Sequence, residues 1–110
     1  MGIYLLSLSH KTTPLKIRSL FAYSEDGKTQ VLKGLLASGR IDEAVVLSTC
    51  NRMEIYCHAM DNGKEPARPV LEIMEQEAIK AAGAEAVEDI GRYIRRFHGR
   101  QAAHHLFRVA

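Results

Sequence analysis

The order of its strand-like and helix-like segments is the feature that most limits how this chain of 110 residues folds. Short apolar or alternating runs, which are typical of strands, occur at residues 3–8, 44–47, 53–59 and 90–97. Segments with helical spacing of apolar residues lie at residues 14–21, 24–38, 69–82 and 103–110. The compact solution for a β-α-β-β-α-β order is a ferredoxin-like sheet. We therefore expect an α+β fold with an antiparallel sheet, helices packed on one face, and extra helices.

Length and composition indicate one globular domain over residues 1–110. Hydrophobic residues make up 46% of the chain and charged residues 25%, which argues against disorder. No membrane-length apolar stretch and no secretory signal occur, so we expect a cytoplasmic protein without a membrane partner. The net charge of +2 gives no general excess that indicates nucleic acid. Near the C-terminal end there is a local cluster of basic residues, Arg92, Arg95, Arg96, Arg100 and Arg108. This cluster could be a solvated face or a contact with nucleic acid.

The expected topology determines which loops lie near one another. Each helical crossover returns the chain to its original direction, so the strands at 3–8 and 44–47 run one way and the other two run the opposite way. The loop that contains Cys50 then shares an edge of the sheet with the loop that contains His10. His98 is expected at the opposite edge. His105 can approach Cys50 only if the final helix crosses back over the sheet.

The two cysteines have different surroundings. Cys57 alternates in phase with Met53 and Ile55, so we interpret it as a core residue. Cys50 lies in a polar connection that leaves its thiol available, although a free cysteine is more often a small buried hydrophobe. Arg52 could lower the pKa of the Cys50 thiol, or it could clamp a carboxylate with two parallel hydrogen bonds. The residues alone leave both roles of Arg52 open.

Neither a metal site nor a dinucleotide site is expected. The spacing of the five histidines and two cysteines matches no zinc pattern. Adjacent residues of a helix point about 100° apart, so His104 and His105 are not expected to face one pocket together. Gly34 and Gly39 are isolated, and no glycine-rich phosphate loop follows a strand.

Three segments together resemble the glutamyl-tRNA reductase family. They are SHKTTPLKIR at residues 9–18, LSTCNRMEIY at residues 47–56 and HLFRVA at residues 105–110. They follow the family's order from end to end of the chain, and the Ser-Thr-Cys-Asn-Arg segment is highly specific. Ser9 is a departure, because the family usually has asparagine there. The chain is therefore similar to the N-terminal catalytic domain of that family.

The resemblance implies a nucleophilic cysteine and a glutamate site. In the family, this domain attacks the ester that joins glutamate to its tRNA, and NADPH then reduces the enzyme thioester to glutamate-1-semialdehyde, which starts tetrapyrrole synthesis. Cys50 corresponds to the nucleophile, and His105 to a histidine on which activity depends. Thr49, Asn51 and Arg52 would line the glutamate site, which favours the clamp role for Arg52. The chemistry fits, because a thioester is electrophilic enough to accept hydride.

The same resemblance implies partners and further parts of an enzyme. The substrate would be glutamyl-tRNA(Glu), and glutamate-1-semialdehyde aminomutase is expected as a partner. NADPH binding and homodimerisation belong to other domains in the family, so we expect that residues 1–110 alone do not complete the reduction. Two alternatives are a non-catalytic tRNA-binding module that uses the C-terminal arginines, and a ferredoxin-like regulatory domain.

Overall fold

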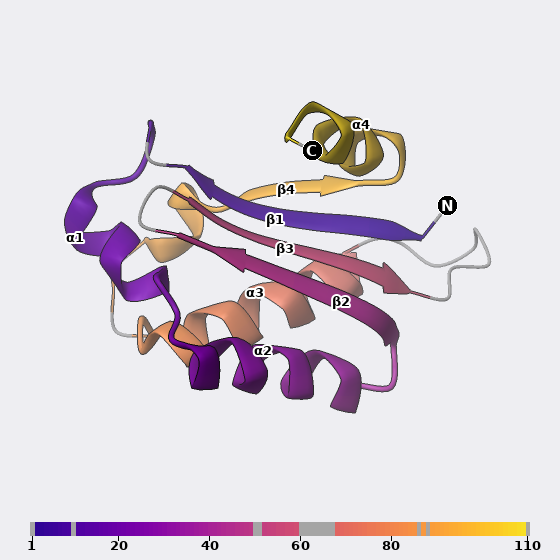
Figure 1. The fold of residues 1–110 in the computed structure, drawn as a ribbon, viewed down its shortest axis with the longest axis horizontal. Coiled ribbons are helices and arrows are strands. Elements are labelled where there is room, and N and C mark those ends of the chain that lie inside the picture. The colour runs from indigo at the N-terminus through magenta and orange to yellow at the C-terminus, as the bar shows by residue number, and fades with distance from the viewer. Residues whose placement is uncertain are drawn as a thin grey trace.

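A four-stranded antiparallel sheet forms the centre of the computed structural model (Figure 1). The structure describes residues 2–9, 11–49, 52–59, 68–85, 87 and 89–109, with the backbone alone at residues 68 and 106–109. The strands are β1 (Ile3–Ser9), β2 (Ile41–Ser48), β3 (Arg52–Ala59) and β4 (Arg95–His98). Their order across the sheet is β2-β3-β1-β4, and each neighbouring pair is antiparallel. This confirms the ferredoxin-like topology that the segment order predicts.

Helices cover both faces of the sheet. The helical elements are α1 (Leu15–Arg18), the 3-10 turn η1 (Ser19–Phe21), α2 (Glu25–Ala37), α3 (Arg68–Ala82), the 3-10 turn η2 (Ile90–Tyr93) and α4 (Arg100–Val109). α2 and α3 pack side by side against one face, and α4 lies over the other (Figure 1). The expected packing on one face therefore holds for α2 and α3, and α4 is an extra helix. No helix within the described ranges is long and apolar enough to cross a lipid bilayer.

The two faces of the sheet bury separate groups of apolar side chains. The main core lies under α2 and α3, and its members with at most 1% exposure include Leu6, Leu8, Val31, Leu35, Ile55 and Met74. The smaller core lies under α4 and contains Leu5, Tyr56 and Ala102. Successive residues of a strand point to opposite faces. Odd-numbered residues of β1 and β4 and even-numbered residues of β3 therefore face α4.

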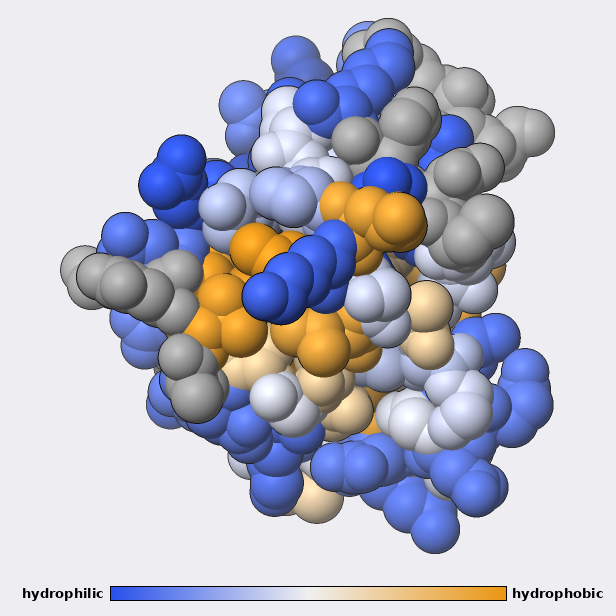
Figure 2. All heavy atoms as spheres, turned by 90° about the vertical axis from the view of Figure 1, so that its left-hand side faces the viewer, coloured by the Kyte–Doolittle hydropathy of each residue, from blue (hydrophilic) through white to orange (hydrophobic). Residues whose placement is uncertain are grey.

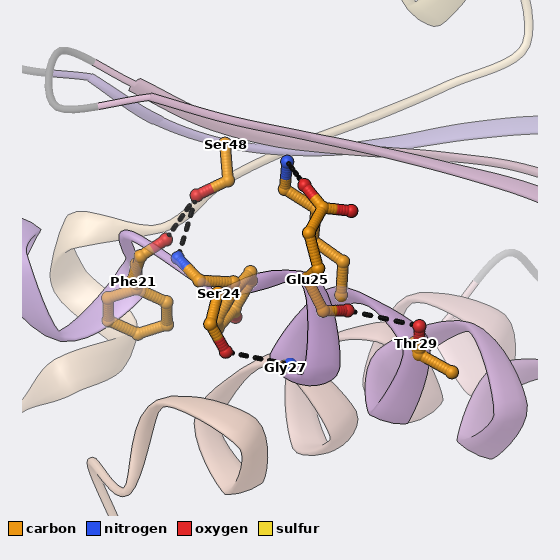
Figure 3. Close-up of polar contacts among 8 residues, drawn as sticks. Phe21, Ser24, Glu25, Gly27, Thr29 and Ser48 are labelled. Atoms are coloured by element: carbon orange, nitrogen blue, oxygen red, sulfur yellow. Dashed lines mark hydrogen bonds and ion pairs between the residues drawn. The ribbon is translucent and has the colours of Figure 1, made fainter.

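The start of α2 follows the usual rules of helix capping. Ser24 Oγ accepts a hydrogen bond from the Gly27 amide at 3.1 Å (Figure 3). Glu25 and Asp26 place acidic side chains in the first turn, near the positive end of the helix dipole. Gly39 follows the helix with a φ of +77°, a conformation that glycine adopts without strain. Both ends of α2 are thus where the sequence predicts them.

Residues 90–97 do not form one strand, contrary to the prediction from sequence. Residues 90–93 form η2, and β4 contains only Arg95–His98. Three apolar side chains of this segment, those of Ile90, Tyr93 and Ile94, belong to or pack against the main core, whereas Phe97 packs against the smaller core. Positions three and four apart meet on one side of a helical turn, so this spacing favours η2 over an extended strand.

Candidate active site

A cavity of about 250 Å³ lies on the α4 side of the sheet, where β1 ends and β3 begins. Its lining residues are Ser7, Ser9, Lys11, Arg52, Glu54, Arg95 and His105. Ser9 of β1 is opposite Arg52 of β3. Ser7 is opposite Glu54 on one side and Arg95 of β4 on the other. Alternate residues of a strand point to the same face of the sheet, so the strand register brings residues that are distant in sequence to one polar cavity.

The end of the molecule where β1 and β2 stop is seen face on in Figure 2. Apolar residues gather near the centre of this view, and hydrophilic residues surround them. The segment α1–η1 lies at the same end (Figure 1), and its Leu15 and Leu20 are 66% and 37% exposed. This end therefore presents an apolar surface beside polar residues.

Glu54 contributes a buried carboxylate to the cavity. Its side chain is only 2% exposed, because α4 covers this face of β3. One carboxylate oxygen, Oε2, is 2.7 Å from His105 Nε2 and accepts a hydrogen bond from Ser7 Oγ at 3.4 Å. The other, Oε1, accepts from Tyr56 OH at 3.4 Å. Such partners are needed because an unpaired buried charge is strongly destabilising.

His105 reaches Glu54 because α4 runs back across the sheet. The Gly99 amide, just before α4, donates to the Ile3 carbonyl at 2.7 Å, so α4 begins at the far end of β1. Further along α4, the His105 ring stacks on Phe97 with centroids 5.4 Å apart and planes 19° apart. The condition that topology sets for His105, a final helix that crosses back over the sheet, is therefore met.

Three permanent cations line the cavity, from Lys11, Arg52 and Arg95. None of them forms an ion pair with any described residue. Glu54 is the one carboxylate of the lining, and it already contacts His105. Like charges in a confined space repel one another, and a bound anion relieves that repulsion. The cavity is consequently suited to an anionic ligand.

Hydrogen bonds close the chain between β2 and β3. The Thr49 amide donates to the Arg52 carbonyl at 2.8 Å, and Thr49 Oγ1 accepts from the Arg52 amide at 3.3 Å. Cys50 and Asn51 are the two residues between them in sequence, and both lie outside the described residues. His10, the other candidate neighbour of Cys50, lies outside them as well. The predicted substrate-site residues Thr49 and Arg52 are thus placed together, and Arg52 and His105 share one cavity.

Ser48 fastens the end of β2, two residues before Cys50. Its Oγ donates to the Phe21 carbonyl at 2.8 Å and accepts from the Tyr23 amide at 2.9 Å (Figure 3). Both hydrogen bonds are part-buried, so removal of the Ser48 hydroxyl takes a protein partner from each backbone group. The side chain therefore ties the end of β2 to the segment between η1 and α2.

We expect Ser48→Ala to lower the free energy of unfolding by about 2 kcal/mol, because two part-buried hydrogen bonds are lost at once. Urea denaturation measures the change. Ser19→Ala is the matched control, since Ser19 Oγ makes one exposed hydrogen bond, to the Lys16 carbonyl at 3.0 Å. Its cost should be below about 0.5 kcal/mol. Equal stability of the two variants would contradict this role of Ser48.

Comparison with known proteins identifies the family. The model of the family "Glutamyl-tRNAGlu reductase, N-terminal domain" matches residues 6–110. This chain belongs to that family. A glutamyl-tRNA reductase of Solibacter usitatus is 37% identical over the whole chain, which covers 25% of that protein. One of Sorangium cellulosum is 39% identical over 96% of the chain, which covers 22% of that protein.

A solved structure agrees with the fold. The glutamyl-tRNA reductase of Methanopyrus kandleri matches 98% of this chain and 22% of its own chain, with a TM-score of 0.65 and 20% sequence identity. At that identity the likeness supports the fold alone. The chain spans about a quarter of the length of the curated relatives that it matches.

The remaining sequence-predicted residues occupy places that suit their interpretation. Cys57 is 3% exposed in the main core, and burial raises the pKa of its thiol to about 12. His104 is exposed, so it does not share the pocket of His105. His98 is opposite Tyr4 of β1, near the far end of the sheet, and the two rings stack.

Sequence reasoning missed Glu54 and Arg95 as residues of the site. Glu54 alternates with the core residues Met53 and Ile55, a pattern that is typical of a solvated face. A helix over that face was the missing information. Arg95 was grouped with Arg96, but the two point to opposite faces, and Arg96 pairs with Glu75 of α3 at 2.7 and 3.1 Å. The alternation along β4 is the signal that separates these arginines.

Proposed function

We propose that this domain cleaves the ester of glutamyl-tRNA by acyl transfer to Cys50. The observation that carries the proposal is the single cavity that joins Arg52, next to the Cys50 connection, with Glu54 and His105. Such a reaction uses a cation that binds the substrate carboxylate, a histidine that transfers a proton, and a second carboxylate that orients the histidine. Arg52, His105 and Glu54 are groups of these three kinds. Membership of the family supports the same substrate class.

Arg52 is the residue that we assign to the side-chain carboxylate of the glutamyl group. Its guanidinium has no acidic partner among the described residues, and it lines the cavity two positions after Cys50 in sequence. A planar guanidinium can donate two parallel hydrogen bonds to a carboxylate. Binding of that carboxylate would place the ester carbonyl beside the thiol and would reject uncharged aminoacyl groups.

In this proposal His105 transfers the proton and Glu54 orients His105. Cys50 Sγ forms a bond to the carbonyl carbon, the bond from that carbon to the ribose oxygen breaks, and the ribose oxygen takes up the proton that the thiol gives up. An ionised carboxylate only accepts hydrogen bonds, so Glu54 keeps a hydrogen on His105 Nε2 and leaves Nδ1 for proton transfer. His105 is thus assigned the general acid–base role.

The reduction that follows in the family uses NADPH, and the described residues do not fit that cofactor. A Rossmann-type dinucleotide site has a glycine-rich turn between a strand and a helix. Here Gly34 lies within α2, and Gly39 follows the end of that helix. We assign no step of hydride transfer to these residues.

Trapping the acyl enzyme tests this function. The protein is mixed with glutamyl-tRNA without NADPH, and its intact mass should increase by one glutamyl group. Hydroxylamine should remove that group, because it cleaves thioesters, and peptide mapping should locate it on Cys50. Binding of the tRNA without any adduct would instead support the non-catalytic tRNA-binding module, and an adduct elsewhere would contradict the role of Cys50.

A further inference from the structure

We propose that Arg95 forms a second anion subsite in this cavity and binds the phosphate of the 3′-terminal nucleotide of the tRNA. This inference rests on the proposed function, which supplies the glutamyl ester, and it adds a recognition role that neither Cys50 nor Arg52 provides. The ligand is a phosphate monoanion one nucleoside away from the reacting ester.

Arg95 and Arg52 lie on opposite sides of the cavity. Their strands are separated by β1, and their partners on β1 are Ser7 and Ser9, two residues apart. A spacing of about 4.8 Å between strands and about 3.4 Å per residue puts their Cα atoms roughly 12 Å apart. Two arginine side chains that start this far apart, on strands separated by β1, can each bind an anionic group of their own.

The side chain of Arg95 is held along β4 rather than toward Arg52. Its guanidinium carbon is 5.3 Å from the centroid of the Phe97 ring, two residues further on the same face of β4. Phe97 also stacks on His105. A cation held over an aromatic ring keeps its outer N–H groups available for an oxyanion. Arg95 is therefore oriented beside the proposed acid–base residue, with no ion pair to any described side chain.

The charges of the substrate match this arrangement. Near its reacting ester, glutamyl-tRNA carries two anions, the side-chain carboxylate of glutamate and the 5′-phosphate of the terminal adenosine. Arg52 accounts for the carboxylate in the proposed function. Of the other two cations of the lining, Lys11 follows Ser9, which is opposite Arg52, whereas Arg95 lies across β1 from Arg52. The geometry therefore assigns the phosphate to Arg95.

Two small substrates that differ only by this phosphate test the assignment. They are adenosine with glutamate esterified to its 3′-hydroxyl, and the same compound with a 5′-methyl phosphate, a monoanionic diester like the linkage in the tRNA. The wild-type enzyme should release the nucleotide about 10-fold more efficiently than the nucleoside, measured as kcat/KM. Arg95→Ala should abolish the difference between the two kcat/KM values, whereas Arg52→Ala should lower both values by the same factor and keep their ratio.

Arg92→Ala is the matched control. Arg92 is an exposed arginine whose guanidinium carbon lies 5.2 Å from the ring centroid of Tyr93, so the substitution removes the same charge and the same kind of ring contact outside the cavity. This variant should keep the preference for the phosphate. The assignment is wrong if Arg95→Ala keeps the preference too, or if it impairs both substrates equally.

Binding of unreactive analogues separates this inference from the proposed function. The two compounds with an amide in place of the ester cannot be cleaved, so their dissociation constants do not depend on Cys50. Arg95→Ala should weaken only the phosphate-bearing amide, by about 10-fold. If the wild-type protein binds the two amides equally tightly, the phosphate subsite is excluded, regardless of the rates at which the esters are cleaved. If the esters give no acyl enzyme, the proposed function fails while the amides still decide the role of Arg95.

Discussion

Cys50→Ser should lower the rate of acyl transfer from glutamyl-tRNA by at least about 10³-fold. A thiol supplies thiolate near neutral pH, whereas a serine hydroxyl does not ionise there without a strong base. Loss of a nucleophile is among the largest effects that one substitution has on an enzyme. Quenched-flow measurement of tRNA release, with the acyl enzyme followed by mass, gives the rate.

Cys57→Ala is the control for that experiment. Cys57 is buried in the main core, and burial raises the pKa of its thiol to about 12, so it carries almost no thiolate at neutral pH. The substitution should lower the free energy of unfolding by about 1 kcal/mol and leave the rate per folded molecule unchanged. If the two variants lost activity equally, the distinction between these cysteines would be wrong.

The sheet could be predicted from sequence because its determinants are local. The alternation along β3 identifies its core face, and Gly39 and Gly83 stop α2 and α3 with positive φ angles. Once four strands and two crossovers are recognised, chain direction and strand order follow. The prediction of a strand for the residues before β4 was wrong, and the reason is local as well. The apolar spacing of Ile90, Tyr93 and Ile94 fits a helical turn.

The site could be predicted only where a motif marked it. Arg52 and His105, which both line the cavity, were predicted as site residues because each belongs to a segment that resembles the family. Glu54 required knowledge of what packs on the second face of the sheet, and alternation cannot supply that. α4 turns an apparently solvated position into a buried carboxylate with three partners.

Glu54→Gln should reduce acyl transfer roughly 10²-fold while the fold remains intact. The amide has nearly the shape of the carboxylate, so packing under α4 is kept and the cost in unfolding free energy should be about 1 kcal/mol. An amide can donate as well as accept, so it no longer enforces a hydrogen on His105 Nε2. A loss of correct histidine orientation and tautomer has large effects on rate where a carboxylate holds the histidine.

The burst rate of acyl transfer and a urea denaturation curve separate these two effects. Glu75→Gln is the control, because Glu75 also pairs with a cation, Arg96, but on the other face of the sheet and with its side chain 20% exposed. The Glu75→Gln variant should have nearly the wild-type rate of acyl transfer and nearly the wild-type free energy of unfolding. Loss of activity in Glu54→Gln that merely tracks unfolding would refute the positioning role.

A double-mutant cycle with His105→Asn gives the decisive comparison. If Glu54 acts through His105, whose Nε2 lies 2.7 Å from its Oε2, the second substitution should add little to the first, because either one already removes the oriented imidazole. Independent roles would give losses that multiply. The coupling therefore measures whether the buried carboxylate and the histidine act as one unit, which stability data alone do not reveal.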